Sequence, residues 1–182
     1  METVSEAIKA RRSVRSFERK DVPEDFIKQL MQAAFCGPSA NNARPWHIVV
    51  VRDQATKAKL ADTHLYSGFI SGAPVVLVVC ADKKLSPEYW IEDCSIASQN
   101  LLLAAHGLGL GTCWVAVRQG ASERYEDYVR KALELPENFR VLCFIPLGYP
   151  AEEPLPRAAV VPPRRIHRDK FGEHLKSENK TP

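Results

Sequence analysis

The residues best suited to chemistry first occur near the amino terminus, where three arginines and a serine fall within five positions. The run is Arg11-Arg12-Ser13-Val14-Arg15. Arginine presents its donors in a planar fork and stays charged at every relevant pH, so this run suits a phosphate ligand. The alternative is the solvated basic end of a helix, which needs no ligand.

A second candidate is the polar loop Pro38-Ser39-Ala40-Asn41-Asn42-Ala43-Arg44-Pro45-Trp46-His47. Its prolines stiffen the backbone, and its side chains can offer fixed donors and acceptors to the edge of a planar ring. The alternative is a plain connection between a helix and a strand, in which the asparagines bond to their own backbone.

A third candidate is the glycine-rich run Gly107-Leu108-Gly109-Leu110-Gly111-Thr112-Cys113-Trp114. Glycines let the backbone approach a flat or bulky group closely, although a simple helix cap would also use one. The run follows a predicted helix and enters a predicted strand, the reverse of the order in a dinucleotide-binding fingerprint.

Hydrophobic periodicity predicts the elements that position these motifs. Thr3 and Glu6 have the spacing of a capping box, and Ser122 is expected to cap a late helix. We expect helices over 3–10, 23–36, 55–61 and 88–106 and after Ser122, with strands over 48–51, 74–81, 112–117 and 141–147. Such alternation favours, by rule of thumb, a parallel doubly wound sheet.

Composition predicts one ordinary globular domain, because 182 residues with 45% hydrophobic content can bury a sizeable core. The five cysteines are widely spaced and show no zinc-ligand pattern, so we expect neither disulfides nor a metal. The amino terminus is charged throughout, and no apolar run approaches the ~20 residues that span a bilayer. We therefore expect a cytoplasmic protein without membrane segments.

The chain after Pro150 is rich in proline and charge and cannot build a core of its own. Within it, residues 158–161 could add as a strand to a neighbouring sheet edge, which is one way in which an arm clasps a partner subunit. A second pair of arginines, Arg164 and Arg165, lies in this segment. Basic groups at both ends of the chain suggest an anionic partner.

Taken in order, RRSVR, PSANNARPWH, GLGTCW after a long helix, and PPRR resemble the nitroreductase family over nearly the whole chain. The resemblance implies an α+β fold, with a mixed, mostly antiparallel sheet flanked by helices, and an intertwined homodimer that binds FMN at its interface. This implication replaces the parallel sheet. Residues 1–168 would form a single FMN-binding domain ending in the dimer-clasping arm, and 169–182 a polar tail.

The resemblance also implies how the cofactor is held. Arg11, Ser13, Arg164 and Arg165 would contact the FMN phosphate, and Arg12 would lie along the ribityl chain. Arg15 would approach the N1 and O2 side of the isoalloxazine ring. Trp114 would introduce a strand that packs on one flavin face, with the backbone near Ala116 close to N5. The other subunit would contribute Pro38, Ser39 and Asn42.

The implied activity is electron transfer from NADH or NADPH to nitroaromatics, quinones or similar small acceptors by a ping-pong mechanism. The flavin carries the chemistry, so no catalytic side chain is nominated, and the lone histidines His47 and His64 are taken as structural. The sequence departs from the family pattern at Arg44, where glutamine is common, at Ala116, where larger members carry glutamate, and over 65–73, which lacks an Asn and a Lys.

Two rival functions stay open. One is a substrate-specific flavin dehydrogenase or reductase of the same fold, and the other is an FMN-binding protein without turnover. Binding to nucleic acid has little support, because the isoelectric point of about 8.6 is below that of typical nucleic-acid-binding domains.

Overall fold

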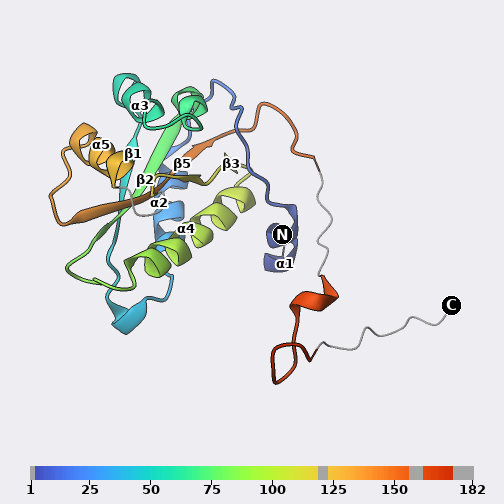
Figure 1. The fold of residues 1–182 in the computed structure, drawn as a ribbon. Helices are drawn as coiled ribbons and strands as arrows, with labels where there is room; N and C mark the ends of the chain where they lie inside the picture. The colour runs from blue at the N-terminus through green and yellow to red at the C-terminus, as the bar shows by residue number, and fades with distance from the viewer. Residues whose placement is uncertain (1–2, 119–122, 156–161, 174–182) are drawn as a thin grey trace.

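One antiparallel sheet lies at the centre of the chain, with helices on both of its faces (Figure 1). The computed structural model describes residues 3–118, 123–155 and 162–173. The strands follow the order β1-β2-β5-β3, and β4 also pairs with β5. Their bounds are β1 Trp46–Val51, β2 Val75–Asp82, β3 Gly111–Thr112, β4 Val115–Ala116 and β5 Phe139–Gly148.

The α+β fold is confirmed, and the parallel sheet expected from alternation is wrong, because each pairing between these strands is antiparallel. A parallel crossover must carry the chain back along the whole length of the previous strand. The connection that contains helix α3 (Gln54–Ala61) instead returns beside the end of β1, since Val51 pairs with Val76. The chain therefore re-enters the sheet in the opposite direction.

Strand β2 separates two apolar clusters and is buried over nearly its whole length. Val75, Leu77 and Val79 face the cluster built with helices α2 (Glu24–Phe35) and α4 (Trp90–Gly107). The residues between them face the cluster that contains Leu60 of α3 and Val129 of α5, whose bounds are Arg124–Ala132. Successive side chains of a strand point to opposite faces, which explains why this run is continuously apolar.

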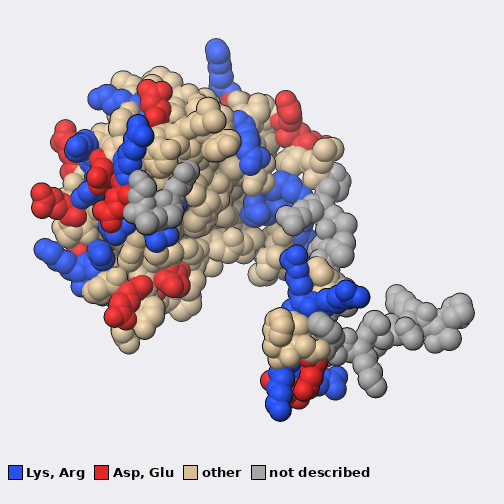
Figure 2. All heavy atoms as spheres, viewed as in Figure 1, with Lys and Arg blue, Asp and Glu red and all other residues tan. Residues whose placement is uncertain are grey.

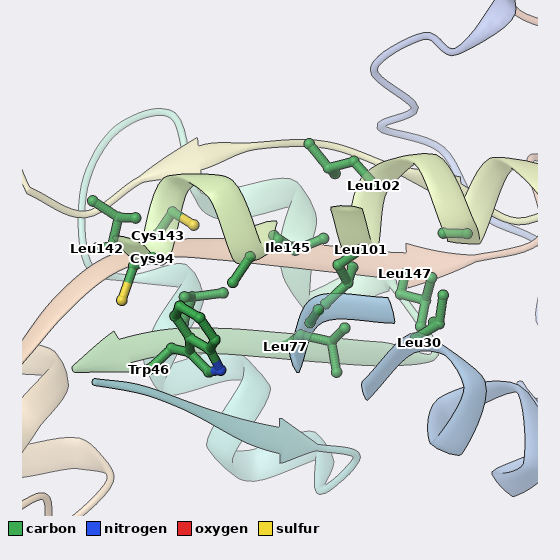
Figure 3. Packing of buried hydrophobic residues seen from close by; sticks show 14 of the residues in the cluster. Leu30, Trp46, Leu77, Cys94, Leu101, Leu102, Leu142, Cys143, Ile145 and Leu147 are labelled. Carbon is green, nitrogen blue, oxygen red and sulfur yellow. The ribbon is translucent and has the colours of Figure 1, made fainter. Parts of the chain in front are cut away.

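The central helix α4 packs its leucines against α2 and the sheet, as Figure 3 shows. Cys94 and Cys143 lie in the same cluster, and all five cysteines of the chain are free thiols. Burial raises the pKa of Cys80 to about 12, and it also raises the pKa values of Cys94 and Cys143. These thiols are apolar packing groups and are poor nucleophiles.

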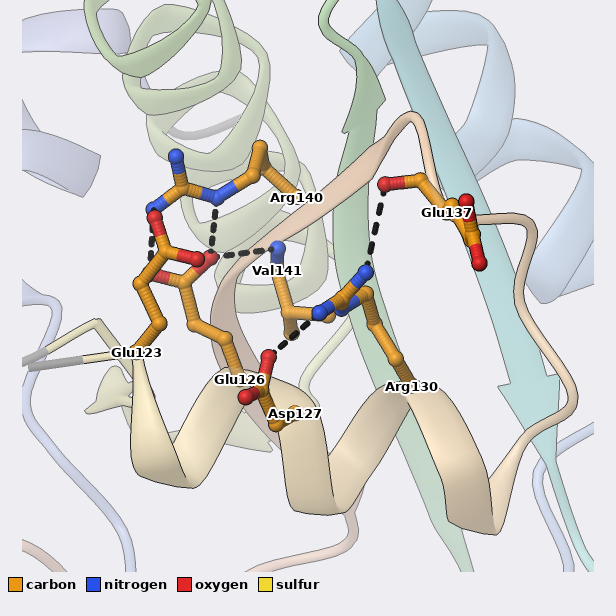
Figure 4. Close-up of polar contacts among 7 residues, drawn as sticks. All are labelled: Glu123, Glu126, Asp127, Arg130, Glu137, Arg140 and Val141. Carbon is orange, nitrogen blue, oxygen red and sulfur yellow. Dashed lines mark hydrogen bonds and ion pairs between the residues drawn. The ribbon is translucent and has the colours of Figure 1, made fainter.

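Helix α5 is attached to β5 by an ion pair between the buried Glu126 and the partly buried Arg140, shown in Figure 4. The Glu126 carboxylate accepts from Arg140 Nε at 2.7 Å and Nη2 at 2.9 Å, and also from the Val141 backbone N–H at 3.2 Å. These contacts with Glu126 raise the pKa of Arg140. The exposed Glu123 adds a second, outer contact to the same guanidinium.

The two ends of the chain are attached along the edge of the sheet. Helix α1 (Val4–Ala10) begins with the predicted capping box and contacts α4, yet it has no buried residue. The following segment runs beside β3, where the Val14 N–H donates to the Thr112 oxygen at 2.8 Å. A Cβ at Gly111 would lie 2.8 Å from the Val14 side chain, so only glycine permits this approach.

Two details of the predicted elements are wrong. The strand expected over 112–117 is broken at Cys113 and Trp114 into β3 and β4. Helix α5 has Glu123 as its N-cap residue, and Ser122 lies outside the described residues, as does the strand expected over 158–161.

None of the described helices combines the length and the apolar character that crossing a membrane requires. Within the same described ranges, no group of three or more His, Cys, Asp or Glu side chains could hold a metal ion. The division of the chain at residue 168 stays a prediction.

Candidate functional site

A cavity of about 590 Å³ brings together three of the predicted site residues. Arg15 comes from the amino-terminal segment, and Trp114 and Ala116 come from the broken strand region. The loop after α3 completes the wall with Leu65 and Tyr66, both largely exposed. The cavity is therefore lined by the Arg15 guanidinium, by the aromatic residues Tyr66 and Trp114, and by strand β4.

His64 ties the loop after α3 to strand β4. Its Nε2 lies 2.9 Å from the Ala116 carbonyl oxygen, and its Nδ1 accepts from the Tyr66 backbone N–H at 3.1 Å. Because Nδ1 is an acceptor, the proton of the neutral ring is on Nε2, which donates to Ala116. Sequence reasoning did not nominate His64, because a lone histidine near an apolar run carries no sign of its partner.

The basic run lies along two smaller hollows beside this cavity. Arg11 and Arg12 line one of about 410 Å³ together with Gly109 and Gly111. Ser13 and Arg15 line another of about 310 Å³. The predicted phosphate residues Arg11 and Ser13 thus lie on the same short segment as Arg15, as they must if one elongated ligand contacts all of them.

Arg12 has several backbone contacts in the single chain. Its Nη1 donates to the carbonyl oxygens of Lys9 at 2.6 Å and Arg11 at 2.8 Å, at the end of α1. Its Nε donates to the Leu155 oxygen at 3.1 Å, at the start of the arm. Arg12 therefore joins the two ends of the chain, and its contact with a ribityl group stays a prediction.

The predicted loop over residues 38–42 lies elsewhere in the single chain. It contains the 3-10 turn η1 (Ala40–Asn42), which lies near the start of α4, whereas α1 lies near the other end of that helix (Figure 1). Ser39 Oγ accepts from the Arg44 N–H at 2.9 Å, and Asn42 Oδ1 accepts from Arg44 Nε at 2.8 Å. Arg44, which replaces the usual glutamine, is thus bonded to its own loop. Pro38 is exposed at the start of this loop.

Arg164 and Arg165 are exposed on η3 (Pro163–Arg165). Residues 162–173, which contain the end of the predicted arm and the start of the predicted polar tail, project away from the sheet, and basic side chains gather where the body meets the arm (Figures 1 and 2). Among the described residues, neither arginine lines a cavity with Arg11 or Arg15. One chain alone therefore assembles only part of the predicted set.

Known proteins resemble this chain over most of its length. A family model described as the nitroreductase family matches residues 8–65 and 61–149. A protein of Methanothermobacter thermautotrophicus named "Putative NADH dehydrogenase/NAD(P)H nitroreductase" is 46% identical over 170 residues, covering 92% of this chain and 87% of its own.

Solved structures agree with these matches. A Parabacteroides distasonis protein of the same name has a TM-score of 0.89 at 33% identity, covering 94% of this chain and 100% of that one. An FMN-dependent nitroreductase of Clostridium difficile has a TM-score of 0.84 at 32% identity, covering 91% and 98%. The names of these relatives are those of flavin- or nicotinamide-dependent oxidoreductases.

Proposed function

Because the chain belongs to the nitroreductase family, we propose that it is an FMN-dependent oxidoreductase that passes electrons from NADH or NADPH to small organic acceptors. Nitroaromatics and quinones are the acceptor classes that we propose. The observation that carries this proposal is the cavity that joins Arg15 to Trp114 and Ala116. These residues come from segments about a hundred positions apart.

The residues present fit FMN. The cavity of about 590 Å³ falls in the range of roughly 300–1,000 Å³ that small-molecule sites occupy. A ligand with a phosphate at one end and a planar ring at the other matches a segment that carries Arg11 and Ser13 before Arg15. The close approach at Gly111 keeps that segment against the sheet, which fixes its direction.

In the proposed complex, Arg11 and Ser13 hold the phosphate together with Arg164 and Arg165 of the arm, and Arg12 lies beside the ribityl chain. The guanidinium of Arg15 lies at the N1 and O2 side of the ring, where a positive charge favours the reduced, anionic form. The backbone at Ala116 faces N5. Bound flavin supplies the hydride-accepting chemistry, and the protein orients it and excludes unsuitable acceptors.

We propose a homodimer, because the single chain leaves apolar side chains of both ends uncovered. Val4 and Ile8 of α1 are 73% and 56% exposed, and Phe171, just after the arm, is 93% exposed. Exposed apolar surface of this kind marks an interaction site. A second copy would cover these residues and would bring its Pro38, Ser39 and Asn42 to the flavin held by the first.

The nicotinamide and the acceptor would use the same open side of the cavity in turn, which gives ping-pong kinetics. Leu65 and Tyr66 line this cavity and are largely exposed. We also propose a cytoplasmic location, because the five cysteines are free thiols, as expected in a reducing compartment.

The experiment is to purify the protein and record its spectrum without oxygen. The proposal predicts a yellow protein whose flavin absorption is bleached by NADH or NADPH and restored by a quinone or a nitroaromatic. Parallel lines in double-reciprocal plots would support the ping-pong order. A colourless protein that takes up no added FMN would overturn the proposal, and bound flavin that neither nucleotide reduces would favour a binding protein without turnover.

The phosphate site is tested by the double variant Arg11→Ala with Ser13→Ala. The variant loses the charged contact of Arg11 and the hydroxyl contact of Ser13, which together should weaken FMN binding by at least about 100-fold. Arg19→Ala is the matched control, since Arg19 lies on the same segment but lines a different hollow. Equal FMN affinity in the double variant and the control would remove the phosphate assignment.

A further inference from the structure

The loop over residues 39–44 has an unusual backbone. Asn41, Asn42 and Arg44 have φ values of 52°, 56° and 45°, in the left-handed region that favours glycine. Asparagine tolerates this region better than most residues, whereas arginine is not among the residues that favour it. A backbone of this kind persists only where the surrounding structure holds it.

Asp93, in the first turn of α4, holds the middle of this loop. Its Oδ1 accepts from the Ala40 backbone N–H at 2.8 Å, and its Oδ2 accepts from Ser86 Oγ at 2.8 Å. Asp93 is only 2% exposed, and Ser86 is also buried. Burying a carboxyl group is unfavourable unless it is hydrogen-bonded, so these two hydrogen bonds offset the cost of burying Asp93. The start of α4 adds a favourable dipole.

The other bonds of the loop do not replace this anchor. Ser39 and Asn42 both bond to Arg44, within the loop itself. The loop is fixed to the body at its ends, where a Cβ at Gly37 would lie 3.1 Å from Ile96 of α4 and where Trp46 enters the core. Between these points, the hydrogen bond from the Ala40 N–H to Asp93 attaches the loop to α4.

Helix α4 carries predicted site elements at both ends. Asp93 at its start anchors the loop, and the glycines after its end line the hollow with Arg11. Its 18 residues form a rod of about 27 Å between the two. A change at Asp93 should therefore affect the loop while leaving the far end of the same helix intact.

We propose that Asp93 is a positioning residue, which holds the loop in the conformation that presents Ser39 and Asn42 to the flavin of the second subunit. This inference rests on the proposed function and deepens it. Asp93 does not touch the flavin, and it acts through the Ala40 N–H. Ser86 supports it by fixing the second carboxyl oxygen.

The test compares four variants by FMN titration, by the melting temperature without FMN, and by hydrogen exchange of residues 39–44. Asp93→Ala should raise the dissociation constant for FMN about 10- to 100-fold, and Ser86→Ala about threefold. Asp93→Asn should stay within about threefold, because its amide can accept from Ala40 and donate to Ser86. In Asp93→Ala, exchange within 39–44 should be faster than in the wild type.

Ser98→Ala is the matched control. Ser98 is a buried serine of the same helix, but its hydroxyl donates to the Cys94 carbonyl oxygen, away from the loop. It should leave FMN affinity and loop exchange unchanged even if the melting temperature falls. If Asp93→Ala does not fold, the comparison of Ser86→Ala with Ser98→Ala carries the test.

Equal FMN affinity and equal loop exchange in Ser86→Ala and Ser98→Ala would overturn the positioning role, and so would wild-type values in a folded Asp93→Ala. A wild-type protein that binds no FMN would overturn the proposed function instead. In that event, loop exchange in the same variants still decides whether Asp93 anchors the loop.

Discussion

The sheet and the two chain ends differ in what holds them. Strand β2 is buried on both faces by residues of its own chain. Helix α1 has no buried residue, although it carries the capping box and the apolar positions of an ordinary amphipathic helix. The body therefore folds by its own packing, whereas the ends, which carry all four predicted phosphate contacts, are incomplete in one copy.

The largest expected effect is on the body. Glu126→Ala leaves the partly buried Arg140 guanidinium without its main partner and should lower the free energy of unfolding by about 2–3 kcal/mol. Glu123→Ala removes only the exposed partner of Arg140 and should cost about 0–1 kcal/mol. Urea unfolding of both variants measures the difference. Equal losses would mean that burial does not set the strength of this pair.

The next effect is on the ends. Ile8→Ser should leave the unfolding of the body nearly unchanged but raise the dissociation constant of the dimer at least about tenfold, since it removes apolar surface twice per dimer. Sedimentation equilibrium provides the measurement. Tyr128→Ser, on helix α5 of the body, is the control and should not alter association. A dimer equally stable in both variants would contradict a role for α1 at the interface.

A smaller effect is expected in the cavity where the two regions meet, because Arg15 of the amino-terminal segment and His64 of the body both line it. His64→Ala removes both contacts that fix the wall of the cavity and should raise the KM for acceptors about three- to tenfold. His64→Gln can still donate to the Ala116 oxygen, so its KM should lie between those of His64→Ala and the wild type. Steady-state kinetics with one quinone compares them. An unchanged KM in His64→Ala would show that the wall keeps its position without this residue.

The smallest effect concerns Asp53, the N-cap of α3, whose side chain accepts from the Thr56 N–H. Hydrogen bonds from Thr56 lower the pKa of Asp53 in the folded state. A carboxyl group with a lowered pKa stabilises the fold fully at pH values above its pKa in the unfolded state. This contribution is lost as the pH falls through its pKa in the folded state. The difference in Tm between the wild type and Asp53→Ala should therefore be full near pH 6 and shrink on acidification toward about pH 2. A constant difference would contradict the assignment.

Local patterns predicted most of the fold. The capping box at Thr3, the buried run of β2 and the long helix α4 follow from period and cap chemistry, which are properties of neighbouring residues. The direction of the strands is set by where each connection returns the chain, and periodicity does not contain that information. The resemblance to the family supplied it.

The site was predicted in part. Arg15, Trp114 and Ala116 meet in one cavity, but His64 and Asp93 were missed. Their partners are backbone groups, the Ala116 oxygen and the Ala40 N–H, which every sequence contains and none reveals. Helical period places Asp93 on the same face as Trp90 and Ala97, and an acid on that apolar face is the one signal that could have identified it.

The central claim is that each flavin site is built from two copies of the chain. It is tested most directly by mixing a chain that carries Arg11→Ala and Ser13→Ala with a chain that carries Ser39→Ala and Asn42→Ala. With a different tag on each chain, the mixed dimers can be isolated, and their FMN content can be compared with that of each parent dimer. The account predicts that both parents bind FMN weakly and that the mixed dimer regains one tight site, because one of its sites has no substitution. If the mixed dimer binds no better than its parents, the two sets of residues do not meet across a subunit interface, and the account is contradicted.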